Sequence, residues 1–584
     1  MKIPENIKNI SLGLKNAKRK AFIISVNRLI LFFVIISLLI VGLTDQKSIL
    51  LLLFPLGYTF IWLIIRFNYY TDLQSFLIEL ERMDEVKQKR AARELNELDP
   101  GLDFLDKKHP FCNDLDLFGP HSLFQLINHT VSVSGRQLLA DNIKSQINQQ
   151  SAIENFHATE ELRKKEKFLR NFEAIGRAFI KGEKNKAFFY QWLDRNEKWS
   201  KVYYIFLALG PLVGMILLLA GAFGFIHTSW IGLWILAGLL FLSIVYKDLH
   251  NAALVWPNEG DIKTFRIWSD LLENEFFVSH KLKELHRPFQ NGKLSKGLKS
   301  LEQVSFMIQN RFNLVYLIFN LLFWLDFFLL WRLKKWKKEF SNDLSHIEGI
   351  FDHWQVMVSL ASFSNEEELK GDVIWEKDTI IEAKNLHHPL IPPLKSIGND
   401  FILEKNQKTV LLTGSNMSGK TTFMRTVGIN MVLVNLGLRP FAEIFQCGPF
   451  QLYTSMRNSD SLGESVSSFY AELARIRQIL EAAESGIQVF YLMDEILKGT
   501  NTIDRVMGSE ALIKQLSQTK SKGIISTHDI ELSQLEKDLP FLVNSSFHSK
   551  IEDREISFDY KLKSGPCPSF NAHKLMELMG IRFQ

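Results

Sequence analysis

The chain has 584 residues, enough for roughly three or four domains, and its 69 basic and 64 acidic residues leave a net charge of +5 that neither requires nor excludes a nucleic-acid partner. A hydrophobic content of 46%, with 46 Phe and 12 Trp, is high for a soluble protein and indicates apolar segments outside ordinary cores. The three cysteines, Cys112, Cys447 and Cys567, lack metal-ligand spacing, so we interpret them as reduced thiols in a cytosolic environment.

The N-terminal region, residues 1–68, is predicted to be a basic segment followed by a membrane hairpin. Two uncharged runs, at about 29–43 and 48–65, are separated by a polar turn at 44–47, and a spanning helix needs about 20 apolar residues. Basic residues before the first run and after the second predict that both ends of the hairpin are cytoplasmic. A cleaved signal peptide is the alternative, but the first run lacks a convincing small-residue cleavage site and a second run follows at once.

The next region, residues 69–112, is predicted to be a helical linker, because Leu73, Phe76 and Leu80 repeat at three- and four-residue spacing. Its remaining positions are largely charged, which is typical of a helix in solvent. Residues 113–372 continue with helical patterns and are predicted to form an all-α core or lever.

A second predicted membrane hairpin interrupts this core. Its uncharged runs cover about 202–226 and 229–246 and are flanked by Lys201 and Lys247, so it returns the chain to the cytoplasm. Glycines are frequent in the first of these runs, as is common where membrane helices pack closely. They are Gly210, Gly214, Gly221 and Gly224.

A fifth apolar run, residues 314–331, contains Asn320 and Asp326 and is followed by a cluster of lysines. One further crossing would place the nucleotide-binding pattern described below outside the cell, where ATP is absent. We therefore expect an apolar helix that lies in the membrane interface or packs against the hairpins, with its basic tail near anionic lipid. Burial in the soluble core is the alternative, and the lysine cluster could also contact nucleic acid.

The last region, residues 373–584, is predicted to be an α/β domain with a phosphate-binding loop. Residues 414–421 fit the pattern G-x-x-x-x-G-K-[ST], between an apolar run and a helix-compatible stretch. The glycines let backbone N–H groups turn toward a phosphate, Lys420 can reach the β- and γ-phosphates, and the Thr421 hydroxyl can bind Mg²⁺. A glycine-rich turn with a chance lysine is the alternative. The residues expected to hold ATP are Gly414, Ser415, Asn416, Met417, Ser418, Gly419, Lys420, Thr421 and Thr422.

Two later stretches are predicted to be buried strands that carry polar groups at their ends. Residues 489–495 form an apolar run that finishes in Asp494 and Glu495, which we assign to Mg²⁺ and to activation of the attacking water. Residues 523–529 present His528 where it could contact the γ-phosphate, with a purely structural histidine as the alternative.

Five motifs occur in a fixed order in this part of the chain. They are residues 385–390, 413–422, 467–473, 492–500 and 526–528. Together they resemble the ATPase domain of the MutS mismatch-repair family, a dimeric P-loop ATPase of ABC type, over residues 380–581. The resemblance implies that Ser467 and Ser468 open a helix whose N-terminus faces the γ-phosphate bound by the partner subunit. The chain departs from the family in the approach to that serine pair, and Ser396 stands where many members carry an aromatic residue that stacks on adenine.

The helical region shows a weaker similarity to the same family. Residues 114–139 resemble the helical core that precedes the ATPase domain in MutS proteins. The second hairpin then falls roughly where DNA-binding relatives insert their clamp, so we hypothesise that a membrane segment has replaced the clamp. No segment resembles the family's N-terminal mismatch-reading domain or its Phe-x-Glu wedge.

These observations predict a multi-domain fold of transmembrane helical hairpins, an all-α MutS-like core and an α/β P-loop ATPase domain of ABC type. The predicted location is multi-pass in the inner (cytoplasmic) membrane, with the ATPase domain in the cytoplasm. The expected cofactors are ATP and Mg²⁺, and the expected partners are a second copy of the chain and membrane lipid. DNA binding, for mismatch repair or damage sensing, is implied by the family resemblance alone. The alternatives are a membrane-remodelling or transport-coupled ATPase that does not act on DNA, and a membrane scaffold that uses nucleotide to set its oligomeric state.

Overall fold

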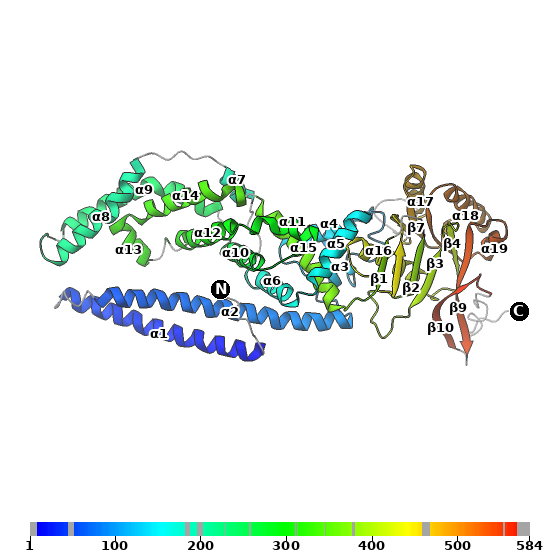
Figure 1. Ribbon diagram of the computed structural model, residues 1–584, viewed down its shortest axis with the longest axis horizontal. Coiled ribbons are helices and arrows are strands. Elements are labelled where there is room, and N and C mark those ends of the chain that lie inside the picture. The colour runs from blue at the N-terminus through cyan, green and yellow to red at the C-terminus, as the bar shows by residue number, and fades with distance from the viewer. Residues whose placement is uncertain are drawn as a thin grey trace.

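The computed structural model describes residues 9–44, 52–180, 187–194, 202–227, 229–255, 258–309, 311, 314–344, 346–375, 380–457, 468–552 and 555–568. The protein is multi-domain and largely helical. An α/β region with two mixed β-sheets lies at one end of its long axis, and apolar helices lie at the other (Figure 1). The predicted hairpin turn from Asp45 to Lys47, the serine Ser467 and the predicted closing segment after Pro568 lie outside the described residues.

The N-terminal hairpin consists of α1 (Ile10–Thr44) and α2 (Leu53–Ala92), which lie side by side (Figure 1). Helix α1 contains a candidate membrane span from Ile10 to Leu38 with a mean hydropathy of 2.4. Only residues 52–65 of the predicted second run are described, at the start of α2, and this part is not among the candidate spans of the described residues.

Helices α8 (Val202–Ala222) and α9 (Ser229–Val255) occupy the two runs of the second predicted hairpin. Each contains a candidate span, residues 203–221 and 229–252, which is less than a fifth buried within the protein. Helices of this length and apolar composition are long enough to cross the hydrocarbon core of a bilayer. The described residues therefore contain three helices long and apolar enough to cross a membrane.

The apolar run at 314–331 does not form the single helix that we predicted. It is divided into α13 (Leu314–Phe323) and α14 (Leu325–Leu344), which meet at 92°. Trp324 adopts a left-handed backbone conformation (φ 54°) at the break, and the Asn320 amide oxygen accepts from Asp326 N–H at 2.8 Å, which caps α14. Both helices pack on α8 and α9 rather than on the first hairpin. The two polar residues inside the run therefore bond to each other across its bend.

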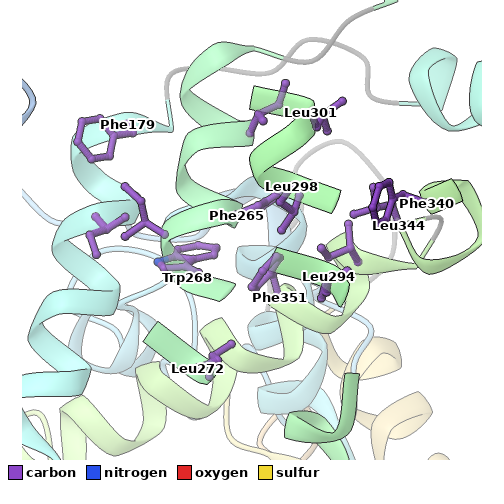
Figure 2. Packing of buried hydrophobic residues seen from close by; sticks show 14 of the residues in the cluster. Phe179, Phe265, Trp268, Leu272, Leu294, Leu298, Leu301, Phe340, Leu344 and Phe351 are labelled. Atoms are coloured by element: carbon purple, nitrogen blue, oxygen red, sulfur yellow. The ribbon is translucent and has the colours of Figure 1, made fainter. Parts of the chain in front are cut away.

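The remaining helices build the core between the apolar helices and the sheets. They are α3 (Leu123–Ile127), α4 (Val133–Lys144), α5 (Gln149–Leu162), α6 (Glu166–Phe179), α7 (Ala187–Asp194), α10 (Glu259–Glu273), α11 (His280–His286), α12 (Lys293–Gln309) and α15 (Ile347–Glu366), with short 3₁₀ turns at Leu102–Phe104 and Arg287–Phe289. A further 3₁₀ turn, Gln534–Lys537, packs against β9 of the larger sheet. Aromatic rings fill the interior: Phe265 stacks on Phe351 at 4.8 Å beside Trp268 (Figure 2). Such buried aromatic packing fixes how the core helices sit on one another.

The larger sheet has the strand order β10-β9-β4-β8-β7-β6. Its strands are β4 (Thr409–Thr413), β6 (Gln451–Ser455), β7 (Val489–Met493), β8 (Lys522–Thr527), β9 (Leu542–Glu552) and β10 (Glu555–Ser564). Strands β4, β7 and β8 are buried throughout and run parallel, so the residues that follow them meet at one edge. The helices of this domain are α16 (Lys420–Asn435), α17 (Ser468–Glu484), α18 (Thr502–Ser517) and α19 (Ile530–Ser533).

The smaller sheet has the order β1-β5-β2-β3, formed by β1 (Asp372–Trp375), β2 (Ile381–Leu386), β3 (Asn399–Leu403) and β5 (Ile444–Cys447). Its turn between β2 and β3 carries the predicted 385–390 motif toward α16, where Asn430 donates to the His387 carbonyl at 3.1 Å. This sheet therefore forms a second wall beside the loop at 414–419.

Candidate active site

The loop between β4 and α16 has the backbone that a phosphate-binding turn requires. Gly414 (φ 151°) and Gly419 (φ 107°) both lie in the region that favours glycine. A Cβ atom on Gly414 would come within 2.7 Å of the Phe547 carbonyl oxygen, so a side chain at this position would clash with backbone. The strand–loop–helix geometry expected from the sequence is therefore present, with helix α16 beginning at Lys420.

Lys420 folds back across this loop. Its Nζ lies 2.9 Å from the Gly414 carbonyl oxygen and 3.1 Å from that of Ser415, and the residue is 4% exposed. Burial lowers the pKa of Lys420, although the nearby carboxylates of Asp494 and Glu495 oppose this effect. A buried ammonium at the mouth of a glycine loop is suited to an anionic ligand.

The loop also contains a buried hydroxyl that fits such a ligand. Ser418 is 1% exposed, and its Oγ has no hydrogen-bond partner among the described residues. Buried polar atoms without partners are rare in folded proteins. An unpaired donor inside the loop, together with Lys420, fits the phosphate groups that the motif implies.

Asp494 follows β7 and lies beside the first residues of α16. Its Oδ2 accepts from the Thr421 hydroxyl at 2.6 Å, and its Oδ1 accepts from Ser526 Oγ. A hydroxyl and a carboxylate in contact are the oxygen ligands that Mg²⁺ takes when phosphates complete its shell. Among the described residues, no group of three or more His, Cys, Asp or Glu side chains is placed to hold a metal ion.

Glu495 is held from two directions at the edge of the sheet. His528 Nε2 lies 2.7 Å from its Oε1, and the Lys498 ammonium forms an ion pair with its Oε2. The hydrogen bond from His528 is the largest cause that lowers the pKa of Glu495 to about 2, and Lys498 lowers it further against the effect of burial. Glu495 is therefore ionised throughout the physiological pH range.

The backbone after Glu495 is held in an unusual conformation. Glu495 (φ 50°) and Leu497 (φ 58°) both lie in the left-handed region, where non-glycine residues are uncommon. The Glu495 N–H donates to Ser526 Oγ at 3.0 Å, and the Leu497 N–H donates to the Glu472 carboxylate. Glu472 thus connects α17 to this loop. It lies within the 467–473 motif, but the sequence analysis assigned it no role. Burial raises the pKa of Glu472.

A pocket of about 230 Å³ adjoins the loop on the side of the smaller sheet. Gly419 and Thr426 line one wall, and Ser396 and Tyr560 line others. Burial lowers the pKa of His388, a further lining residue, to about 4, so this imidazole is neutral. Tyr560 was missed in the sequence, because no motif marks the segment from which it comes.

The structure thus brings together most of the predicted site residues. The 414–422 loop, Asp494, Glu495 and His528 converge at one edge of the larger sheet. Ser468 begins α17, whereas Ser467 is outside the described residues, so the predicted serine pair stays a prediction.

Comparisons with known proteins agree with this arrangement. Residues 410–581 match the family model for MutS domain V. The chain is 29% identical over 257 residues to the DNA mismatch repair protein MutS of Bacillus cytotoxicus and 30% identical to those of Bacillus cereus and Bacillus thuringiensis. Each match covers 43% of this chain and 28% of the relative, so the chain spans under a third of the relatives' length.

The described residues within 410–581 thus belong to a domain that is similar to MutS domain V, a domain of ATPase type. This similarity confirms the resemblance that the five motifs indicate.

Proposed function

We propose that residues 373–584 form a P-loop ATPase that binds ATP with Mg²⁺ and hydrolyses it. The observation that carries this proposal is the contact of Thr421 with Asp494 beside a glycine loop that Lys420 closes. In this assignment the 414–422 loop holds the phosphates, and Thr421 and Asp494 hold the metal, which neutralises phosphate charge. Measuring ATP hydrolysis by the purified protein with and without Mg²⁺ tests it.

In the proposed reaction Glu495 accepts the proton of the attacking water, and His528 orients the Glu495 carboxylate and contacts the γ-phosphate. A proton acceptor works best when its pKa is near the working pH. The Lys498 ion pair opposes this, since it contributes to a Glu495 pKa of about 2. We infer that Lys498 leaves Glu495 when ATP and a partner subunit complete the site.

This role of Lys498 predicts a change in the pH dependence of hydrolysis. Lys498→Ala removes one of the two partners that depress the Glu495 pKa, so that pKa rises toward its ordinary value of 4.5. Because protonation of Glu495 in the nucleotide-free protein then occurs at higher pH, the acid limb of the kcat/KM profile, which reports the free enzyme, moves upward. Steady-state rates between pH 4 and pH 8, the range about the ordinary carboxyl pKa, measure the shift. An unchanged acid limb would contradict the assignment.

The pocket beside the loop is proposed to hold the adenine base. Tyr560 supplies an aromatic ring at this pocket, where Ser396 offers none. Base–aromatic stacking contributes about 1–3 kcal/mol, so Tyr560→Ala is expected to weaken ATP binding by ~5- to 150-fold. Binding of inorganic tripolyphosphate, which has no base, is the control and should not change. Equal losses for both ligands would show that Tyr560 acts on the loop instead.

The ATPase domain is proposed to act as a homodimer. Apolar side chains near the site are unusually exposed: Met417 of the loop is 85% exposed, Tyr470 of α17 67%, and Ile503 of α18 73%. Exposed apolar groups beside polar ones are typical of protein interfaces. In such a dimer the start of α17, with Ser467 and Ser468, would approach the nucleotide of the partner.

The protein is proposed to be anchored in the inner membrane as a multi-pass protein, with the ATPase domain in the cytoplasm. The candidate spans in α1, α8 and α9 support the membrane anchor, and the basic residues that precede the apolar part of α1 favour a cytoplasmic start. The proposal includes the predicted run at 48–65 as a further crossing, since an even number of crossings keeps the ATPase domain in the cytoplasm. Membrane lipid is then a permanent partner. Closure of two ATPase domains on ATP would move the helical core, and with it the membrane helices.

What this motion acts on has two candidate answers. The relatives are DNA mismatch repair proteins, which supports DNA binding for mismatch repair or damage sensing. The candidate spans instead favour a membrane-remodelling or transport-coupled ATPase that does not act on DNA. ATPase rates of the detergent-solubilised protein with mismatched duplex, matched duplex, no DNA, or liposomes discriminate them. Stimulation by DNA with a steep salt dependence supports the first, and stimulation by lipid alone supports the second.

A further inference from the structure

The C-terminal end of α2 contacts the turn that borders the nucleotide pocket. Arg93, the residue after the helix, donates from Nε to the Pro389 carbonyl oxygen at 2.8 Å. Its two terminal nitrogens donate to the two carboxylate oxygens of Glu367, each at 2.8 Å. The Arg93 side chain is 1% exposed, and a planar guanidinium alone can make all three bonds at once.

The same turn contacts the helix that begins with the phosphate-binding lysine. Asn430 of α16 donates to the His387 carbonyl oxygen at 3.1 Å, and the neighbouring His388 lines the pocket. Three consecutive residues, His387 to Pro389, thus touch α16, the pocket and Arg93. A shift of this turn on nucleotide binding would reach α2 without any intervening loop.

A second arginine fixes α2 to the helical core. Arg90 is 4% exposed and donates to the Asn128 carbonyl oxygen at 2.5 Å. Its Nη1 lies 2.6 Å from His129 Nε2, and His129 Nδ1 lies 2.9 Å from a Glu173 carboxylate oxygen. The end of α2 is therefore tied to the helical core by a buried network of hydrogen bonds to charged groups.

The other end of α2 belongs to the membrane hairpin. The helix is continuous over 40 residues, which corresponds to about 60 Å, and Figure 1 shows it running from the hairpin tip toward the sheets. Near its start, Tyr58, Ile61 and Ile65 are 74%, 58% and 62% exposed, which suits contact with lipid. One continuous helix therefore has an exposed apolar segment near one end and contacts the turn beside the nucleotide pocket at the other.

We propose that α2 couples the membrane to the nucleotide site through Arg93 and Pro389, so that the bilayer acts as an effector of nucleotide binding. The proposal rests on the nucleotide-binding function proposed above. Bilayer thickness changes the tilt and depth of apolar helices, and α2 carries that change to the 387–389 turn. Because coupling between two sites is reciprocal, nucleotide must also shift the hairpin in the membrane.

The test uses the full-length protein in liposomes of short-chain or long-chain phosphatidylcholine. The dissociation constant of a fluorescent ATP analogue is expected to differ by ~5-fold or more between the two bilayers, the lower range of typical coupling. Arg93→Lys keeps the positive charge but loses the Nε donor to Pro389 and the paired donors to Glu367, so the ratio of the two dissociation constants should fall to about 1. Glu367→Gln keeps the shape of the side chain that Arg93 binds but removes its charge, so it should also lower the ratio of the two dissociation constants.

The matched control is Asp84→Asn, on the same helix. It removes the partly exposed ion pair of Asp84 with Arg170 (2.8 Å), which lies away from Pro389, and should retain the lipid dependence. Equal affinity of the unmodified protein in both bilayers, or full lipid dependence in Arg93→Lys, would overturn the coupling while leaving nucleotide binding intact. Absence of nucleotide binding in every bilayer and in detergent would instead reject the proposed function, and the coupling with it.

Discussion

Replacing Lys420 by alanine is expected to abolish nucleotide binding. The lysine is the buried cation of the loop, 2.9 Å from the Gly414 carbonyl oxygen, and burial lowers its pKa. Its charge is thus poorly stabilised until phosphate oxygens arrive. Hydrogen bonds to charged groups contribute about 1.5–3 kcal/mol each, so the loss of bonds to two phosphates should weaken ATP binding by ~100-fold or more.

Titration of the purified protein with a fluorescent ATP analogue measures this loss. Lys514→Ala is a suitable control, because Lys514 pairs with Glu510 of its own helix and is 51% exposed. The thermal midpoint of Lys420→Ala without nucleotide is measured alongside, because the variant also loses the bonds of Lys420 to the Gly414 and Ser415 carbonyl oxygens, and a retained folding transition separates lost binding from lost folding. Undiminished affinity in Lys420→Ala would refute the assignment of the 414–421 loop.

The parts of the site that the sequence could predict are those encoded by local patterns. Strands β4, β7 and β8 are continuous apolar runs, and parallel strands place their following residues at a common edge. The positions of Asp494 and His528 near the glycine loop therefore follow from the order of apolar runs and polar ends along the chain. The glycines at 414 and 419 likewise reflect a backbone conformation that few other residues adopt.

The parts that sequence reasoning missed depend on contacts between distant segments. Arg93 and Glu367 are separated by 274 positions, and nothing local in either segment indicates their pairing. Tyr560 reaches the pocket only because β10 folds back beside β9, with a register irregularity in that hairpin. The bend at Trp324 could not be predicted for a different reason. The polar residues of its apolar run are evident in the sequence, but the direction of the helix after the break also depends on the glycines of α8 that pack against it.

Replacing Glu495 by glutamine is expected to stop turnover while preserving ATP binding. Glutamine keeps the shape of the side chain and its contact with His528, which lies 2.7 Å from Glu495 in the unmodified protein. It cannot accept a proton from water, and general-base catalysis contributes about 10²- to 10⁴-fold to a rate. Loss of the negative charge also removes the ion pair with Lys498 and the repulsion between the Glu495 carboxylate and the γ-phosphate. The affinity of the variant for ATP should therefore equal or exceed that of the unmodified protein.

Because the proposed dimer forms on ATP and separates on hydrolysis, the Glu495→Gln protein should accumulate as an ATP-bound dimer. Light scattering after size-exclusion chromatography, with and without ATP and Mg²⁺, measures the mass of the detergent-solubilised particle. Glu484→Gln is the control, because Glu484 lies at the end of α17 that is far from the site. This variant should hydrolyse ATP normally and return to its nucleotide-free state once the ATP is consumed. Normal turnover in Glu495→Gln would exclude Glu495 as the base. A blocked enzyme that stays monomeric on ATP would keep that role and reject the dimer, so the two halves of the mechanism are tested separately.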